Sequence, residues 1–175
     1  YIPTEGSTVT RSAELANNRG NADLFYDSEG VLYAEIFGLA DDRHRQLTIS
    51  NGSNSNTVAI MLKPGLNRID GYVNSGGSNQ ALMFAPLDTN QFNKIAVKYK
   101  ENDFALWLNG VEVATDTSGS TPTGLNELAF DKGNGGDNFY GNVKSLAVFK
   151  EALTDFELAE LTSSVKLNPF TFTVT

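Results

Sequence analysis

The sequence predicts an all-β domain, an antiparallel jelly-roll β-sandwich with one short C-terminal helix. Short apolar stretches with the two-residue alternation of half-buried strands recur along the chain, separated by turns rich in Gly, Asn, Ser and Pro. Turn signals at intervals of about 8–12 residues are typical of sandwiches and barrels. The rhythm of strands alternating with helices that a parallel sheet requires is not seen, and there is no internal repeat.

We expect about a dozen short strands, because each alternating stretch is long enough for one strand. Residues 1–8 read as a lead-in linker, 9–164 as the jelly-roll domain, and 165–175 as a final strand or a linker to a further domain. The stretches predicted to be extended are, in order, Val9–Leu15, Ala22–Tyr26, Val31–Phe37, Gln46–Ser50, Thr57–Leu62, Asn67–Val73, Gln80–Phe84, Ile95–Lys100, Phe104–Leu108, Val111–Asp116, Leu125–Phe130 and Tyr140–Phe149. Lys63–Gly65 is predicted to be a turn.

A hairpin is predicted around Asn109-Gly110, since both positions of a two-residue turn between paired strands favour φ > 0. Such a turn sets the register of the strands on either side. The expected pairs are Leu108 with Val111, Leu106 with Val113 and Phe104 with Thr115 on an apolar core face, and Trp107 with Glu112 and Ala105 with Ala114 on the other face.

The single predicted helix begins after Thr154. Glu157 stands three residues later, which is the spacing of a capping box. Leu153 and Leu158 occupy the positions of a hydrophobic staple, and the helix is expected to end near Thr162.

Composition excludes several classes of function. The 175-residue chain contains no cysteine, so it has neither disulfides nor thiolate metal sites. Its net charge of -8 disfavours binding to nucleic acid and to anionic membrane surfaces. No apolar run approaches the roughly 18 residues of a membrane-spanning helix. Tyr1 is not an initiator methionine, so we expect a fragment or a processed product.

Two motifs resemble those of laminin-G-like jelly-roll domains, which belong to the concanavalin-A-like lectin/glucanase fold. The first is Asn93–Lys100 followed by Phe104–Gly110, and the second is Gly141–Phe149 followed by Ala152–Leu161. With the earlier hairpins, the resemblance covers about nine-tenths of the chain.

The lead-in Tyr1–Arg11, together with Leu32–Glu35 and Ile49–Gly52, is similar to jelly-roll domains appended to bacteriophage tail and virion proteins. The resemblance implies a module on a particle that adsorbs to glycan-coated cells. Many such domains hold a structural calcium through an acidic residue at the position of Lys144. The Glu-x-Asp-x-x-Glu motif of the glucanases of this fold does not occur in this chain.

Trp107 and Glu112 are the first candidate site. An aromatic ring can stack on the C–H face of a sugar while a neighbouring carboxylate accepts hydrogen bonds from hydroxyl groups. The alternative is that Trp107 packs under the loop Thr117–Gly124 or under the C-terminal helix, because tryptophan is usually buried.

Polar loops provide the other candidate carbohydrate contacts. Arg43 and His44 lie in a charged loop with Asp41 and Asp42, which is either a hydrogen-bonding surface or simply solvated. Asn74 and Asn79 bound a polar turn and, with the turn 51–56, offer adaptable hydrogen bonding. Ordinary hairpin turns have the same composition, so both interpretations stay open.

A calcium ion has one candidate site, the oxygen-rich loop 131–138. Asp131 and Asp137 could be ligands together with backbone carbonyls. The loop lacks the spacing of an EF-hand, and its glycines are equally explained by a wide turn.

The predicted function is a non-catalytic, lectin-like module of a phage virion or tail protein that recognises host-surface glycans outside the cell. Catalysis has little support, because the only histidine has no triad context and Glu35 and Glu112 are the only carboxylates suggested for one cleft. The expected partners are glycans and other virion proteins, with homo-oligomerisation through the parent protein. The alternatives are a structural decoration or oligomerisation domain without ligand, and an accessory domain of a polysaccharide-degrading enzyme.

Overall fold

The computed structural model describes residues 19–38 and 43–164 of the chain. These residues form ten strands, a short 3-10 turn and one α-helix. The elements are β1 Glu29–Gly38, β2 Arg45–Ser50, β3 Thr57–Lys63, η1 Pro64–Leu66, β4 Arg68–Ser75, β5 Ser78–Pro86, β6 Asn93–Lys100, β7 Phe104–Leu108, β8 Val111–Asp116, β9 Glu127–Ala129, β10 Gly141–Phe149 and α1 Asp155–Thr162.

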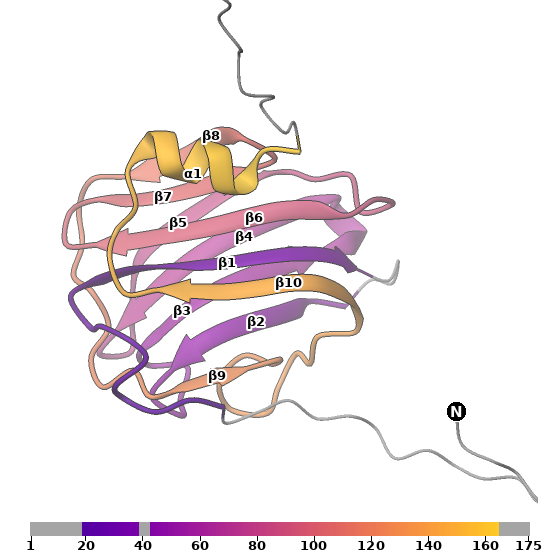
Figure 1. Cartoon of the computed structure of the whole chain (residues 1–175). Coiled ribbons are helices and arrows are strands. Elements are labelled where there is room, and N and C mark those ends of the chain that lie inside the picture. The colour runs from indigo at the N-terminus through magenta and orange to yellow at the C-terminus, as the bar shows by residue number, and fades with distance from the viewer. Residues whose placement is uncertain (1–18, 39–42, 165–175) are drawn as a thin grey trace, which may run out of the picture.

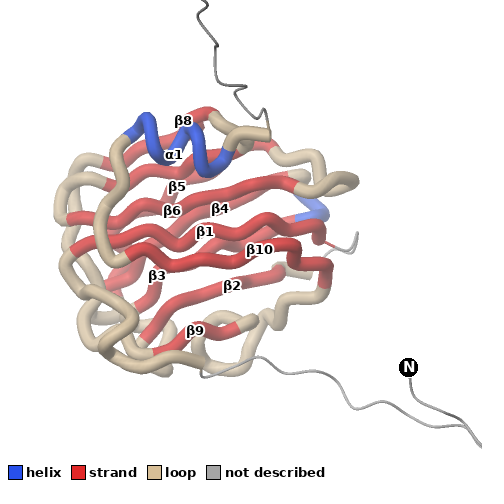
Figure 2. The backbone as a smooth tube through the Cα atoms, viewed as in Figure 1, coloured by secondary structure: helices blue, strands red, loops and turns tan. Residues whose placement is uncertain are grey.

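The strands form two five-stranded antiparallel sheets that pack face to face. The front sheet has the order β10-β1-β6-β7-β8, and the back sheet has the order β5-β4-β3-β2-β9 (Figure 1). Loops gather at the two ends of the sandwich, as the backbone trace shows (Figure 2). The predicted all-β jelly-roll sandwich with a short C-terminal helix is therefore confirmed.

The core lies between the sheets and is built by the alternation seen in the sequence. On β6, for example, Ile95, Val97 and Tyr99 are fully buried against the opposite sheet. Burial raises the pKa of the Tyr99 phenol, and its hydroxyl donates a hydrogen bond of 2.7 Å to the carbonyl of Tyr26. The core positions on β1–β5 and β7 follow the same alternation, and Phe25, Leu87 and Leu125 add to the core from loops.

The outer face of the front sheet is covered by α1 over β6, β7 and β8. The helix begins with the predicted capping box, in which Thr154 and Glu157 each accept a hydrogen bond from the other's backbone N–H. Leu158 is fully buried against the sheet. The residues that it joins in one apolar cluster are Val31, Tyr33, Ala96, Ala105 and Trp107.

The predicted hairpin turn is confirmed, with φ values of 50° at Asn109 and 90° at Gly110. Leu108 pairs with Val111 and Trp107 with Glu112, as expected. A β-bulge then changes the register, because one extra residue is inserted in β8. The predicted pairs beyond it are wrong: Leu106 pairs with Ala114, Ala105 with Thr115, and Phe104 with Asp116. Val111, expected on the core face, is exposed.

Most other predicted elements are confirmed, with ends that differ by a few residues. The stretch Ala22–Tyr26 is not a strand, and its first part is a turn in which Leu24 donates its backbone N–H to the Asn21 carbonyl at 3.0 Å. The strand expected at Leu125–Phe130 is limited to β9. The expected strands in Val9–Leu15 and in 165–175 lie outside the described residues.

Candidate functional site

The front sheet offers no sugar platform at Trp107. The indole is only 6% exposed because α1 lies over it, so its ring cannot stack on a saccharide while the helix is docked. Glu112 is exposed and stands opposite Trp107 on β8, as predicted from the register. Of the two interpretations offered by the sequence, packing under the C-terminal helix is the one that the structure shows.

Glu35 and Glu112 do not form a catalytic pair. They lie on β1 and β8, which are separated by β6 and β7 in the front sheet. Three strand spacings amount to about 14 Å, beyond the separation of about 5–9.5 Å that glycoside hydrolysis uses. Glu35 is instead 3.2 Å from the ammonium group of Lys144.

The outer face of the back sheet is different, because it presents charged and aromatic side chains to solvent. At its centre, Asp70 is 0% exposed and accepts hydrogen bonds from Arg68 through Nε at 2.6 Å and Nη2 at 2.9 Å. The Lys63 ammonium group is 2.6 Å from Asp70 Oδ2. Hydrogen bonding to Asp70 raises the pKa of the Arg68 guanidinium, which therefore stays charged.

Local structure brings these three side chains together. Lys63 ends β3, and the 3-10 turn that follows is closed by Asn67 in the left-handed region at φ 45°. Arg68 therefore starts β4 directly opposite Lys63. Asp70 is two residues further along β4, so it shares the outer face with Arg68 by the two-residue period of a strand.

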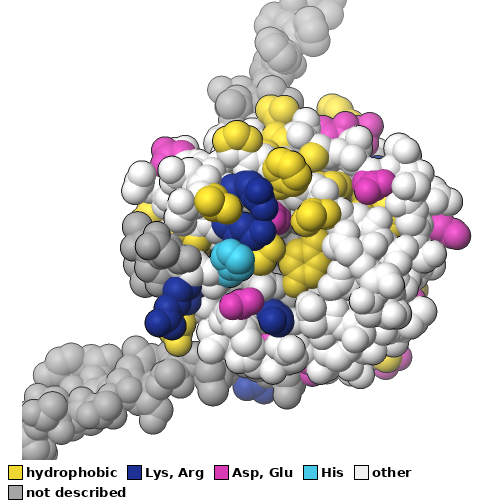
Figure 3. Space-filling model, turned by 180° about the vertical axis from the view of Figure 1, so that it is seen from behind, with side chains coloured by type: hydrophobic (Ala, Val, Ile, Leu, Met, Phe, Trp, Pro, Cys, Tyr) yellow, Lys and Arg dark blue, Asp and Glu magenta, His cyan; other side chains and the backbone are white. Residues whose placement is uncertain are grey.

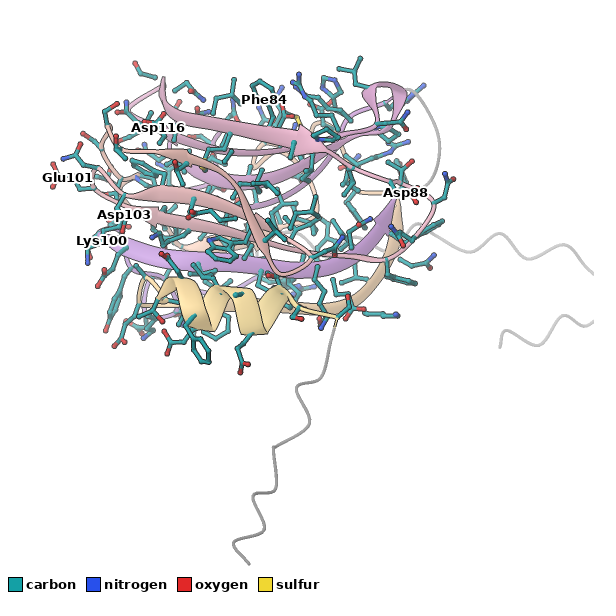
Figure 4. All side chains as sticks on the ribbon, turned by 90° about the horizontal axis from the view of Figure 1, so that it is seen from above. Phe84, Asp88, Lys100, Glu101, Asp103 and Asp116 are labelled. Carbon is teal, nitrogen blue, oxygen red and sulfur yellow. The ribbon has the colours of Figure 1, made fainter. Side chains whose placement is uncertain are left out.

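Aromatic surface lies next to this ion network. Phe84 pairs with Asp70 from the neighbouring strand β5, and its ring is 4.8 Å from the Arg68 guanidinium carbon. Phe84 is 54% exposed, and Leu82 on the same strand is also exposed. Figure 4 shows Phe84 on the side of the molecule opposite α1. A flat apolar ring beside hydrogen-bond donors is thus available to a ligand.

A polar chain of hydrogen bonds continues across the face. The Tyr72 hydroxyl donates to Gln46 Oε1 at 2.6 Å, and Gln46 Nε2 donates to Asp137 Oδ2 at 3.0 Å. Lys132 is 4.0 Å from the same carboxylate oxygen. Burial, and then the charge of Asp137, raise the pKa of the Tyr72 phenol, which keeps its proton as a donor.

Asn74 and Asn79 lie at one end of the back sheet. They pair across β4 and β5, with Asn79 Nδ2 3.2 Å from Asn74 Oδ1. Asn74 Nδ2 donates to the Asn54 carbonyl at 2.9 Å, and the Tyr72 hydroxyl is 3.2 Å from Asn54 Oδ1. The structure therefore joins the two polar turns that the sequence proposed as recognition loops, and places them beside the outer face.

His44 lies just before the first residue of β2, at the other end of the sheet from these asparagines. It lines a surface pocket of about 340 Å³ with Lys63, Gly65 and Leu66. Figure 3 shows this side of the molecule, where Lys and Arg side chains lie beside the histidine and among hydrophobic side chains. Arg43 is exposed next to His44, and the acidic residues of the same predicted loop lie outside the described residues.

Asp131 and Asp137 hold protein donors. Asp131 is buried and accepts a 2.6 Å hydrogen bond from the backbone N–H of Gly133, while Asp137 accepts one from Gln46. Within residues 19–38 and 43–164, no three His, Asp or Glu side chains gather as metal ligands would. Both carboxylates are thus engaged by donors of the loop 131–138 and of β2, and the calcium site at this pair stays a prediction.

The sequence reasoning missed the centre of this site, namely Lys63, Arg68, Asp70, Tyr72 and Phe84. A signal was present, because Arg68, Asp70 and Tyr72 alternate with apolar residues and must share one face of a strand. Nothing in that pattern tells whether the face is covered. In the described part of the chain, the structure places α1 against β6, β7 and β8 of the front sheet and leaves Phe84 on the back sheet 54% exposed.

Among solved structures, the chain resembles the CBM40 of the Ruminococcus gnavus IT-sialidase, with 17% identity over 87% of this chain and 96% of the other, and a TM-score of 0.68. The same module has been solved bound to alpha2,3 sialyllactose. The leech intramolecular trans-sialidase matches at 18% identity over 91% of this chain and 28% of the other, with a TM-score of 0.65.

A third similar structure is the carbohydrate binding module CBM66 from Bacillus subtilis, with 14% identity over 70% of this chain and 75% of the other, and a TM-score of 0.52. At these identities the likeness concerns the fold. No curated protein sequence matches the chain.

No helix in the described parts of the chain is long and apolar enough to span a membrane. A family model described as "Concanavalin A-like lectin/glucanases superfamily" matches residues 38–159. That match covers most of the sandwich, the whole of the first motif on which the resemblance rested, and the second motif and α1 as far as Ala159. The chain therefore belongs to the concanavalin A-like lectin/glucanases superfamily.

Proposed function

We propose that the chain is a non-catalytic carbohydrate-binding domain and that its ligand lies on the outer face of the back sheet. One observation carries the proposal: this face exposes Phe84 beside the Lys63–Asp70–Arg68 network, whereas Trp107 on the front sheet lies under α1, which packs over β6, β7 and β8. The fold likeness to CBM40 and CBM66 modules supports it.

The chemistry of saccharide recognition fits these residues. The exposed ring of Phe84 would stack on the C–H face of a sugar, and Arg68 and Lys63 would donate hydrogen bonds to its oxygens. Asn79 lies on β5, the strand of Phe84, toward its other end, and adds an exposed amide. The arrangement combines one apolar surface with a few polar groups that fix orientation, as ligand sites generally do.

The same face is poorly equipped for hydrolysis. A glycosidase needs one carboxyl group that can donate a proton and a second that remains ionised. Asp70 is fully buried with both oxygens engaged by cations, and Asp137 accepts a hydrogen bond from Gln46. We therefore assign binding rather than cleavage to this surface.

A glycan array followed by titration calorimetry tests the proposal, with sialyllactose among the ligands because a similar module binds it. We expect Phe84→Ala to weaken binding by at least tenfold and Trp107→Phe to leave the affinity within twofold. If Trp107→Phe abolishes binding in a folded protein while Phe84→Ala does not, the ligand lies elsewhere and the proposal fails.

We also propose that the domain, assigned to residues 9–164, is displayed outside the cell on a phage virion or tail protein and contacts other virion proteins. The support is the resemblance of the lead-in segment to phage-appended jelly rolls. Sequencing the neighbouring region of the gene tests this setting, because a tail-fibre, coiled-coil or collagen-like neighbour is expected.

A second setting has its own support. The chain matches 28% of the leech trans-sialidase, so a domain of this fold is also found within a glycan-processing enzyme. A catalytic domain in the neighbouring sequence would favour an accessory module of such an enzyme. A purely structural, oligomerising domain would instead bind no glycan and form a trimer in light scattering.

A further inference from the structure

The ion network on the back sheet has more positive than negative charge. Asp70 carries one negative charge, while Lys63 and Arg68 each carry one positive charge. One cation would suffice to neutralise a buried carboxylate. The second cation therefore leaves a local surplus of positive charge, in a chain whose net charge is -8.

Burial is distributed unequally among the three groups. The Asp70 side chain is 0% exposed, whereas the side chain of Lys63 is 14% exposed and that of Arg68 is 30% exposed. A ligand that approaches this face would consequently meet N–H donors while the carboxylate stays hidden below them. The surface presented is that of an anion site.

Within the described parts of the chain, Asp70 holds the guanidinium of Arg68 in a defined orientation and leaves further N–H donors available. Of its five N–H groups, one on Nε and one on Nη2 bond to Asp70. The ring of Phe84 packs against the plane at 4.8 Å. The remaining pair of parallel N–H groups, one on Nη1 and one on Nη2, has the spacing that a planar carboxylate accepts in a bidentate hydrogen bond.

A recess beside Lys63 gives an acidic group room to enter. The pocket of about 340 Å³ is lined by Lys63, the same residue that contacts Asp70, and by His44. Its volume falls within the range of small-ligand sites, roughly 300–1,000 Å³. His44 would add a further donor to this pocket.

We propose that the ligand of the back-sheet face is an acidic saccharide, whose carboxylate binds to Arg68 and Lys63 while Phe84 stacks on the sugar ring. Asp70 acts as a positioning residue that holds both cations. This inference rests on the proposed function and names the chemical class of its ligand. Neutral parts of the saccharide extend along the sheet toward Asn79.

The test compares acidic glycans with matched neutral ones. Uronate and sialic-acid oligosaccharides are titrated against the chain beside their methyl esters, which keep the sugar rings but remove the charge. We expect each acid that binds to do so at least tenfold more tightly than its ester. Raising the ionic strength from about 0.05 to 0.5 M should weaken the acid alone, since salt screens exposed charges.

Variants then show which residues cause the preference for the acid over its ester. Arg68→Gln and Lys63→Gln should each reduce the acid-over-ester ratio to near one, and Arg68→Lys should reduce it partly because it keeps the charge without the planar fork. Lys100→Gln is the matched control, because it removes the same charge from β6 of the other sheet. Thermal melting of every variant confirms that it is folded.

The outcomes distinguish failure of the carboxylate assignment from failure of the proposed glycan binding. If esters bind as well as acids, or if only sulfated glycans bind, the carboxylate assignment is overturned while glycan binding stands. If Lys100→Gln lowers the ratio as much as Arg68→Gln, the preference arises from overall charge and the site assignment fails. If no glycan of any kind binds, the proposed function itself falls.

Discussion

Replacing Leu158 by alanine tests the central geometric conclusion, that α1 forms part of the core on the front sheet. Leu158 is fully buried in the cluster that contains Trp107. Removing three carbon atoms at about 0.8 kcal/mol each, with a contribution from the cavity left behind, gives a loss of about 2–4 kcal/mol in the free energy of unfolding. For a domain of this size that corresponds to a melting temperature lower by about 5–12 °C.

The assay can use Trp107 itself, since it is the only tryptophan in the chain. Urea unfolding is followed by its fluorescence and by far-UV circular dichroism. Phe156→Ala is the matched control on the same helix, because Phe156 is 71% exposed and should change stability by no more than about 0.5 kcal/mol. Equal stability of Leu158→Ala and wild type, with unchanged Trp107 emission, would refute the docking of α1 and reopen the front sheet as a binding surface.

Three further changes test other parts of the structure. Asp70→Asn leaves two cations unpaired and should cost about 1–3 kcal/mol, a loss that shrinks in high salt if partial exposure screens the cations; an equal loss in urea melts at both salt concentrations contradicts this. The hydrogen bond from the backbone N–H of Thr154 lowers the pKa of the Glu157 carboxyl below 4.5. The stability that this ionised carboxylate adds is therefore present above pH 4.5 and is lost as the pH falls through the lower pKa of the folded state. Glu157→Gln should flatten that part of the acid-unfolding curve. Gly110→Ala places a side chain at φ 90° and should cost about 1–2 kcal/mol by thermal melting, whereas Gly136→Ala, at a glycine without positive φ, should cost less.

The sequence alone determined the features that depend on neighbours in the chain. Alternation identified the strands because side chains of a strand point to opposite faces every second residue. Asn109-Gly110 predicted the hairpin turn, and the spacing of Thr154 and Glu157 predicted the start of the helix, since both are local hydrogen-bonding and φ preferences. Each of these is confirmed.

The bulge in β8 could not be predicted in this way. It adds one residue between Glu112 and Ala114, and its signal is weak because the residue types around it fit either register. The predicted pairs next to the turn are right and those beyond the bulge are wrong, so a local error shifted every later pair by one residue.

Only the tertiary structure decided which sheet is open to a ligand. The Trp107–Glu112 pairing was predicted from register, but register does not reveal that a helix some fifty residues later in the chain covers the ring. In the same way, Arg68, Asp70 and Phe84 looked like ordinary strand residues in the sequence. The exposure of Arg68 and Phe84 depends on long-range packing that, within residues 19–38 and 43–164, places the α-helix against the front sheet, and alternation along one strand carries no information about that packing.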